Sequence, residues 1–289
     1  MSPLRDRSLP TVGPLALLAL LACACGEANG RLLGGQLPGS DVSWDDPIDG
    51  KTASTLRVGR CGDGVAQVEL IDDMEDGDAK ILPIAGRINT WFSFNDQTLT
   101  GMQVPAMGTS FFRMSQLEAP RGSSKLAMRN FGSGFTDWGA GVGFDFLVQS
   151  PYNASAYAGV GFWARLSSNG TPFPMRLNVS DSNTSPLGGV CDVDCQPPSR
   201  VRTRDVEDGV CDSNRGPCFD EFGADLGNLG SEWTFFKFTW SALKPVNWSL
   251  KNLTNLVTKE LYGVRLQIAP RQTFDFWVDD VYFLCPTGK

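Results

Sequence analysis

Histidine is absent from all 289 residues of this chain. Its absence excludes a Ser-His-Asp or Cys-His nucleophile, a zinc-binding His-Glu-x-x-His helix and a histidine proton shuttle. Enzymes that work with carboxylates alone, such as glycosidases, remain compatible with this composition. Most other hydrolases are not.

Basic residues are in deficit, with 25 lysines and arginines against 32 acidic residues and an isoelectric point near 4.7. A nucleic-acid partner is therefore not expected, because binding to phosphate backbones normally needs a basic face. The 42% of hydrophobic residues is enough to bury a core of one large domain or two small ones.

Sustained helical periodicity is missing as well, and only the stretch 250–261 has a weakly helical pattern. Short apolar or alternating segments are separated instead by glycine, asparagine, aspartate and proline. This pattern predicts an all-β fold, a jelly-roll β-sandwich, without an internal repeat. The predicted strands are Val65–Asp73, Trp91–Asn95, Phe111–Leu117, Lys125–Phe131, Val142–Val148, Gly159–Leu166, Met175–Ser180, Trp233–Trp240, Tyr262–Ile268 and Phe274–Leu284.

The N-terminus has the pattern of an export signal. Arg5 and Arg7 precede an apolar run at 15–22, which is far shorter than the roughly 20 residues that cross a bilayer. The run ends at Cys23 in a sequence that resembles the bacterial lipobox; Cys25 offers a second, poorer register, and an ordinary secretory signal is the alternative. We expect a signal sequence at 1–25 with lipidation at Cys23, a flexible tether at 26–60 and a domain at 61–289. The protein would be lipid-anchored to the cell envelope, at the outer membrane or cell surface.

Eight cysteines in an exported chain indicate disulfides. Cys61 precedes the first predicted strand and Cys285 follows the last, so a bridge between them would join the two ends of the domain. The others lie in a polar insertion from 188 to 222, where two disulfides are favoured over a four-cysteine zinc site. Their connectivity stays open; the four residues are Cys191, Cys195, Cys211 and Cys218.

Carboxylates cluster near both ends of the domain, in the turn 72–78 and at Asp279 and Asp280. The latter pair lies in a strand that is apolar on both sides, so at least one carboxylate faces a packed layer and needs a partner. Oxygen ligands from Asp73 and Glu75, joined by Asp279, would suit a structural Ca²⁺ ion. The alternative is that these carboxylates only cap turns and accept backbone hydrogen bonds.

Several segments carry a family resemblance. The sequence LIDDMEDGD at 70–78 resembles the opening of calcium-binding jelly rolls of the galactose-binding-like superfamily, and FWVDDV at 276–281 resembles their closing strand. Segments 86–96, 138–144 and 152–164 are similar to parts of family 11 carbohydrate-binding modules. The resemblance implies a β-sandwich, a Ca²⁺ ion near Glu75 and Asp279, and a glycan-binding groove. Two departures are Met74, where an aromatic residue is usual, and the long cysteine-rich insertion.

Aromatic residues are plentiful, but packing in the core is the default role for any one of them. Trp163, Phe236, Phe238 and Trp240 fit core positions of strands. Trp91 and Trp138 are the candidates for ligand contact, because each has turn residues and polar residues beside it.

The leading hypothesis is an envelope-anchored, non-catalytic protein that binds polysaccharide or glycan. A structural or protein-interaction lipoprotein on the same scaffold is the first alternative. A carboxylate-only glycosidase or lyase is the second, and it would need two acids roughly 5–10 Å apart beside a cleft.

Overall fold

The computed structural model describes residues 55–109, 112–193, 216–249 and 252–287. Cys23, the signal sequence, nearly all of the tether, and Cys195 and Cys211 therefore lie outside the described residues. Within the described ranges, no helix has the length and apolar character needed to cross a membrane.

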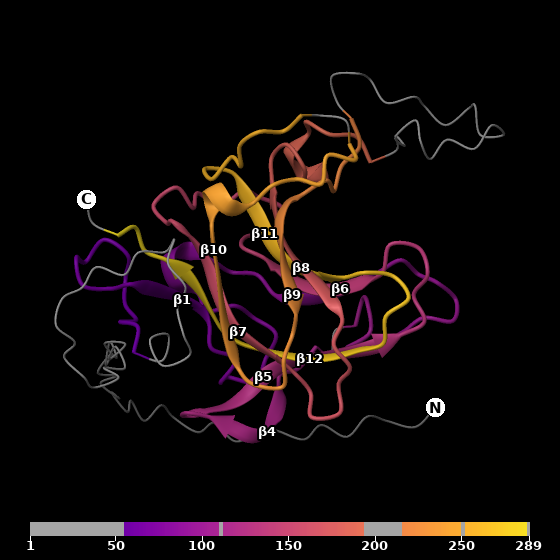
Figure 1. The fold of residues 1–289 in the computed structure, drawn as a ribbon. Coiled ribbons are helices and arrows are strands. Elements are labelled where there is room, and N and C mark those ends of the chain that lie inside the picture. The colour runs from indigo at the N-terminus through magenta and orange to yellow at the C-terminus, as the bar shows by residue number, and fades with distance from the viewer. Residues whose placement is uncertain (1–54, 110–111, 194–215, 250–251, 288–289) are drawn as a thin grey trace, which may run out of the picture. The chain divides into compact units, whose positions relative to one another are not determined.

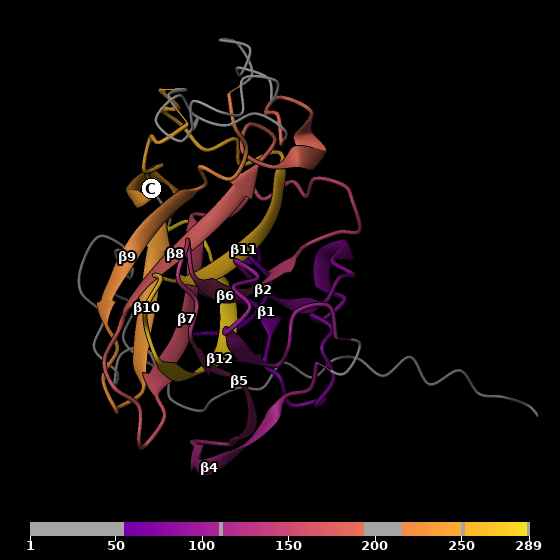
Figure 2. The same ribbon diagram turned by 90° about the vertical axis from the view of Figure 1, so that its right-hand side faces the viewer.

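Two antiparallel sheets form a sandwich, which confirms the predicted all-β class (Figure 1). One sheet has seven strands, in the order β10-β7-β12-β5-β3 with β1 paired to β12 and β4 paired to β5. The other has five strands, in the order β2-β6-β11-β8-β9. Figures 1 and 2 agree in placing the short helix η2 and the β4 hairpin at opposite ends of the sandwich.

The elements have the following bounds: β1 Val68–Asp72, η1 Ile84–Gly86, β2 Trp91–Asn95, β3 Met102–Val104, β4 Ser115–Arg121, β5 Ser124–Ser133, β6 Ala140–Asp145, β7 Gly159–Leu166, β8 Pro174–Asp181, η2 Pro186–Gly188, β9 Phe222–Asn228, β10 Thr234–Thr239, η4 Trp240–Ala242, β11 Leu261–Ile268 and β12 Phe274–Leu284.

Three details differ from the sequence prediction. The weakly helical stretch 250–261 contains no helix in its described residues and leads directly into β11. Strands β3 and β9 were not predicted, because β3 has only three residues and β9 contains two glycines that lower its strand propensity.

The core lies between the two sheets and is built by alternation along the strands. In the five-stranded sheet Val142, Leu266 and Leu177 point inward, and they meet Phe162, Phe276 and Val278 of the other sheet in one buried cluster. Since neighbouring residues of a strand face opposite sides, the residues between them face outward and are free to form a surface.

The predicted bridge between Cys61 and Cys285 is confirmed, with Cα atoms 5.1 Å apart across 224 residues of sequence. The bridge follows from the topology, because β1 pairs antiparallel with β12 and so brings both ends of the domain together. In the insertion, Cys191 bonds Cys218, with a Cα separation of 5.0 Å. This pairing rules out the four-cysteine zinc site.

Candidate functional site

The outer face of the five-stranded sheet carries an ordered set of aromatic, amide and charged side chains. Strand pairing brings Phe92 opposite Gly143, Gly143 opposite Arg265, and Arg265 opposite Asn178, so these residues form one row across the sheet. A second row runs from Phe94 through Gly141, Gln267 and Arg176 to Asp225. We call these two rows, together with Trp138, Asp145, Ser180 and Glu221, the platform.

Glycines let the side chains of the platform lie flat against the sheet. A Cβ atom at Gly143 would lie 2.9 Å from Cγ of Arg265, and one at Gly141 would meet the ring of Phe94. The same holds at Gly223, where a Cβ atom would be 2.8 Å from Nε of Arg176. The neighbouring side chains thus occupy the space above bare backbone, and the face stays shallow.

Aromatic rings form one end of the platform. Phe94 and Trp138 stack with their centroids 6.1 Å apart and their planes 23° apart. Phe92 lies beside Phe94 at 6.2 Å, and the guanidinium of Arg265 lies 5.6 Å from the centre of the Phe92 ring. All three rings are partly exposed. They offer an apolar surface of the kind on which a flat ligand can be laid.

Hydrogen bonds lock the polar centre of the platform. Asn178 donates to Gln267 at 2.9 Å, Gln267 donates to the backbone oxygen of Trp138 at 3.3 Å, and Nε of Arg176 donates to Asn178 at 3.1 Å. Each amide is therefore held in one orientation before any ligand arrives. Preorganised polar groups of this kind lower the entropic cost of binding.

A charged cluster completes the platform around Arg265. This guanidinium lies 3.2 Å from Oδ1 of Asp145 and 3.1 Å from Oε1 of Glu221, and it donates to the hydroxyl of Ser180 at 2.6 Å. Burial raises the pKa of Glu221 and of Asp145, while the positive charge of Arg265 acts in the opposite direction on both. The Asp145 side chain is 27% exposed and that of Glu221 only 6%, so the acceptor capacity for hydroxyl donors lies on Asp145.

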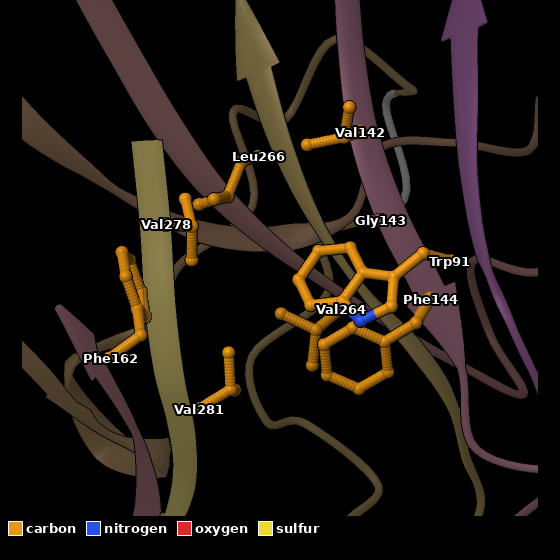
Figure 3. A pocket seen from close by; sticks show the side chains of 9 residues that line it. All are labelled: Trp91, Val142, Gly143, Phe144, Phe162, Val264, Leu266, Val278 and Val281. Atoms are coloured by element: carbon orange, nitrogen blue, oxygen red, sulfur yellow. The ribbon is translucent and has the colours of Figure 1, made fainter. Parts of the chain in front are cut away.

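Trp91 is not part of the platform, and the prediction that it contacts ligand is wrong. Its side chain is only 4% exposed, packs edge-on against Phe144 at 4.8 Å, and donates from Nε1 to Asp72 at 2.7 Å. Figure 3 shows the indole among the core side chains of both sheets. Its neighbour Phe92 faces the other side of the strand and takes the outward position instead.

Trp138 keeps its predicted place as a candidate for ligand contact, because it is partly exposed and adjoins Phe94. The phenylalanines Phe92 and Phe94 were missed by the sequence analysis. The signal for them is the β6 sequence Gly141-Val142-Gly143-Phe144, in which glycines alternate with core residues and leave space opposite outward rings.

Between the sheets, the void found among the described residues is too small for a ligand. The void lined by Trp91, Phe162 and Val281 holds about 10 Å³ (Figure 3). That volume is at the lower limit for a single water molecule, and its lining is apolar.

Two of the three residues predicted to bind Ca²⁺, Glu75 and Asp279, meet at Ser124. Its hydroxyl donates to Oε1 of Glu75 at 3.0 Å and to Oδ2 of Asp279 at 2.7 Å. Burial raises the pKa of Asp73, and the nearby carboxylates of Asp280 and Glu75 raise it further. The sequence thus identified a real cluster of carboxylates.

A guanidinium already pairs with one of the three predicted ligands. Arg121 donates to Oδ2 of Asp279 at 2.9 Å and pairs with Asp280, while Glu75 accepts from the backbone amides of Lys125 and Leu126 at 2.7 and 3.0 Å. Burial and Asp280 raise the pKa of Asp279 to about 6, and Arg121 opposes them. Within the described part of the chain, no three acidic or cysteine side chains are grouped to hold a metal ion. In this arrangement the three residues do not fit Ca²⁺, because Arg121 already neutralises Asp279 and backbone amides already bond Glu75.

Comparisons with solved structures give β-sandwich carbohydrate-binding modules. The family 11 module of a cellulosomal cellulase of Clostridium thermocellum has 11% identity and a TM-score of 0.44, covering 77% of this chain and 96% of its own. The xylan-binding domain of a Paenibacillus barcinonensis protein has 8% identity and a TM-score of 0.39, covering 77% of this chain and 97% of its own. A family 30 carbohydrate-binding module has 9% identity and a TM-score of 0.39, covering 68% and 92%. No protein-family model and no curated protein matches the sequence.

Proposed function

We propose that this protein is a non-catalytic, envelope-anchored lipoprotein whose platform binds polysaccharide or glycan. The observation that carries the proposal is the combination of stacked, partly exposed rings with amides already fixed by hydrogen bonds on one flat sheet face. A pyranose has an apolar face that packs on aromatic rings and a rim of hydroxyls that needs oriented donors and acceptors. The platform supplies both along one surface.

The electrostatics of the platform suit a neutral or hydroxyl-rich ligand. Arg176 is bound by Asp225 at 3.2 Å and Arg265 is bound by two carboxylates, so the described platform has no cation left over for an anionic sugar. Hydroxyl groups can donate to the carboxylates and accept from the amides without bringing a charge that must be neutralised.

Affinity measurements with single variants test the platform. We expect Phe94→Ala and Trp138→Ala each to weaken glycan binding by about tenfold or more, since each removes half of a stacked pair at the centre of contact. Val65→Ala serves as the control, because Val65 is 61% exposed and precedes β1, a strand of the other sheet. Glycan binding that survives both aromatic substitutions at unchanged melting temperature would refute the assignment of this face.

A protein-interaction role is the second candidate, favoured by exposed apolar residues on two loops beside η2 and β9. Phe219, Val246 and Trp248 are 57%, 62% and 38% exposed. Asp220 holds the two loops together, because its carboxylate accepts from the backbone amides of Val246, Asn247 and Ser249 at 3.0–3.1 Å. A stable protein partner in crosslinked envelopes, lost in Phe219→Ser and Trp248→Ser but not in Phe94→Ala, would select this role.

A further inference from the structure

A groove lies on the side of the sandwich opposite the platform, on the outer face of the seven-stranded sheet. It encloses about 420 Å³ between strand β5, labelled in Figure 1, and the described residues 104–109 and 113–115. That volume falls within the range of small-ligand sites, roughly 300–1,000 Å³. The residues that line it are Val104, Pro105, Ala106, Thr109, Arg113, Ser115, Arg129 and Phe131.

The floor of the groove is a partly exposed aromatic ring that is held rigidly. The guanidinium of Arg129 lies 5.3 Å from the centre of the Phe131 ring and 5.0 Å from that of Trp277. Two hydrogen bonds, of 2.9 and 2.7 Å, fix Arg129 to the carboxylate of Asp275. Arg129 is therefore already neutralised, and its role is to hold the ring in place rather than to bind an anion.

The alternation of arginine and aromatic residues continues beyond the groove. Arg165 lies 5.3 Å from the Trp233 ring and 6.0 Å from the Trp277 ring, and Arg121 lies 4.9 Å from Trp163 and 5.6 Å from Trp233. These contacts between arginines and aromatic rings connect strands β4, β5, β7 and β12 of the sheet. The floor of the groove is thus preformed, which favours ligand binding over collapse of the space.

The rim of the groove has a cation that is not neutralised. Arg113 is exposed and, among the described residues, has no carboxylate within ion-pair distance. In this it differs from Arg129 of the same groove, which pairs with Asp275. A guanidinium presents a fork of donors that matches a carboxylate.

The remaining wall is apolar. Val104 is 40% exposed, and Met107 beyond it is 43% exposed, so the groove opens onto an apolar edge at β3. An occupant that satisfies this lining needs a flat apolar face for Phe131 and an anionic group for Arg113.

We propose that this groove binds a ring that carries a carboxylate, with the ring against Phe131 and the carboxylate on Arg113. Two sources share this chemistry: a uronic acid unit of a glycan, and an aromatic acid such as a hydroxycinnamate. The groove lies on the other sheet and has a different charge from the platform. A test of this proposal therefore gives a result that does not depend on whether the platform binds glycan.

Calorimetric titration of the full chain with trigalacturonate and with ferulate tests the proposal, in a Trp138→Ala background that weakens binding at the platform. We expect millimolar or tighter binding of at least one acid, weakened about tenfold or more by Arg113→Gln and by Phe131→Leu. Binding of trigalacturonate alone would identify a uronate site, and binding of ferulate alone an aromatic-acid site.

Lys125→Gln is the matched control, because Lys125 is an exposed cation on the same strand and lies about 20 Å from Phe131, at roughly 3.3 Å per residue. It should leave the affinity unchanged. The proposal is overturned if neither acid binds, if Arg113→Gln binds as well as the parent, or if Lys125→Gln loses as much affinity as Arg113→Gln.

Discussion

Replacing Arg121 by methionine should both destabilise the domain and create a binding site for calcium. Arg121 is the cation of a cluster in which Asp279 is fully buried and Asp280 lies beside it. Methionine keeps much of the length and the apolar stem of arginine, so its contacts with Trp163 and Trp233 are partly preserved. What the substitution removes is the positive charge.

The magnitude follows from burial. Removing one partner of a buried ion pair costs about 3–5 kcal/mol. The Arg121 side chain is 16% exposed, so the lower part of this range, about 3 kcal/mol, applies. For a domain of this size each kcal/mol shifts the melting temperature by roughly 2–4 °C, which gives a decrease of about 6–12 °C.

Calcium should restore part of the lost stability in the variant. With Arg121 gone, the neighbouring carboxylates of Asp279 and Asp280 lose their counter-charge, and carboxylate oxygens are ligands that Ca²⁺ prefers. At 100 times its dissociation constant, a ligand that binds only the folded state adds about 2.7 kcal/mol.

Differential scanning calorimetry of wild type and Arg121→Met, each in Ca²⁺ and in EDTA, measures these effects. Wild type should melt at the same temperature in both solutions, whereas the variant should be stabilised by Ca²⁺. Arg176→Met is the control, because Arg176 pairs with the largely exposed Asp225 and should show no calcium effect. A wild-type melting temperature that falls in EDTA would refute the reasoning, since it would mean that an ion and not Arg121 neutralises the cluster.

Three further outcomes are expected. Arg87→Met should lose about 3–5 kcal/mol in urea unfolding, because Arg87 is fully buried and bonds Glu69 at 3.1 Å; a loss below 1 kcal/mol would contradict this. Cys61→Ser with Cys285→Ser should lower stability by about 5 kcal/mol at most, the loop-entropy limit for 224 residues, and unchanged melting would show that the bridge is dispensable. Burial raises the pKa of Glu221 in the folded state above its unfolded value, so stability should fall as pH rises through the folded pKa, and Glu221→Gln should flatten that slope in melts between pH 4 and 8.

The all-β fold could be predicted because the alternation of apolar and polar residues that marks a strand is a local pattern in the sequence. Alternation in Val264–Ile268 places Val264 and Leu266 in the core, and the register with β6 and β8 confirms it. The bridge between Cys61 and Cys285 was predictable for a different reason, since the first and last strands of such a sandwich are neighbours. Strand β9 was missed because its glycines weaken the pattern and the adjoining insertion obscures its start.

The candidate site was harder to predict because it depends on which side of a strand faces out. In Trp91-Phe92-Ser93-Phe94 three of four residues are aromatic, so the sequence does not show which pair is buried. If the alternation is shifted by one residue, the side chains assigned to the core and those assigned to the surface change places. The partner strand decides: Phe92 and Phe94 pair with glycines, whose outward sides have room for a ring, whereas Trp91 pairs with the buried Phe144.

The carboxylate cluster shows the other limit of sequence reasoning. The turn at 72–78 and the pair at 279–280 were correctly predicted to meet, because β1 and β12 are adjacent strands. The cation was not predicted, because Arg121 lies 158 residues from Asp279 and reaches it only through the hairpin of β4 with β5. A cluster of acidic residues shows that a positive charge is needed nearby. That charge can come from an arginine or lysine side chain as well as from a metal ion. A family resemblance predicts which acidic residues meet, but the group that neutralises them has to be identified in the structure of the chain itself.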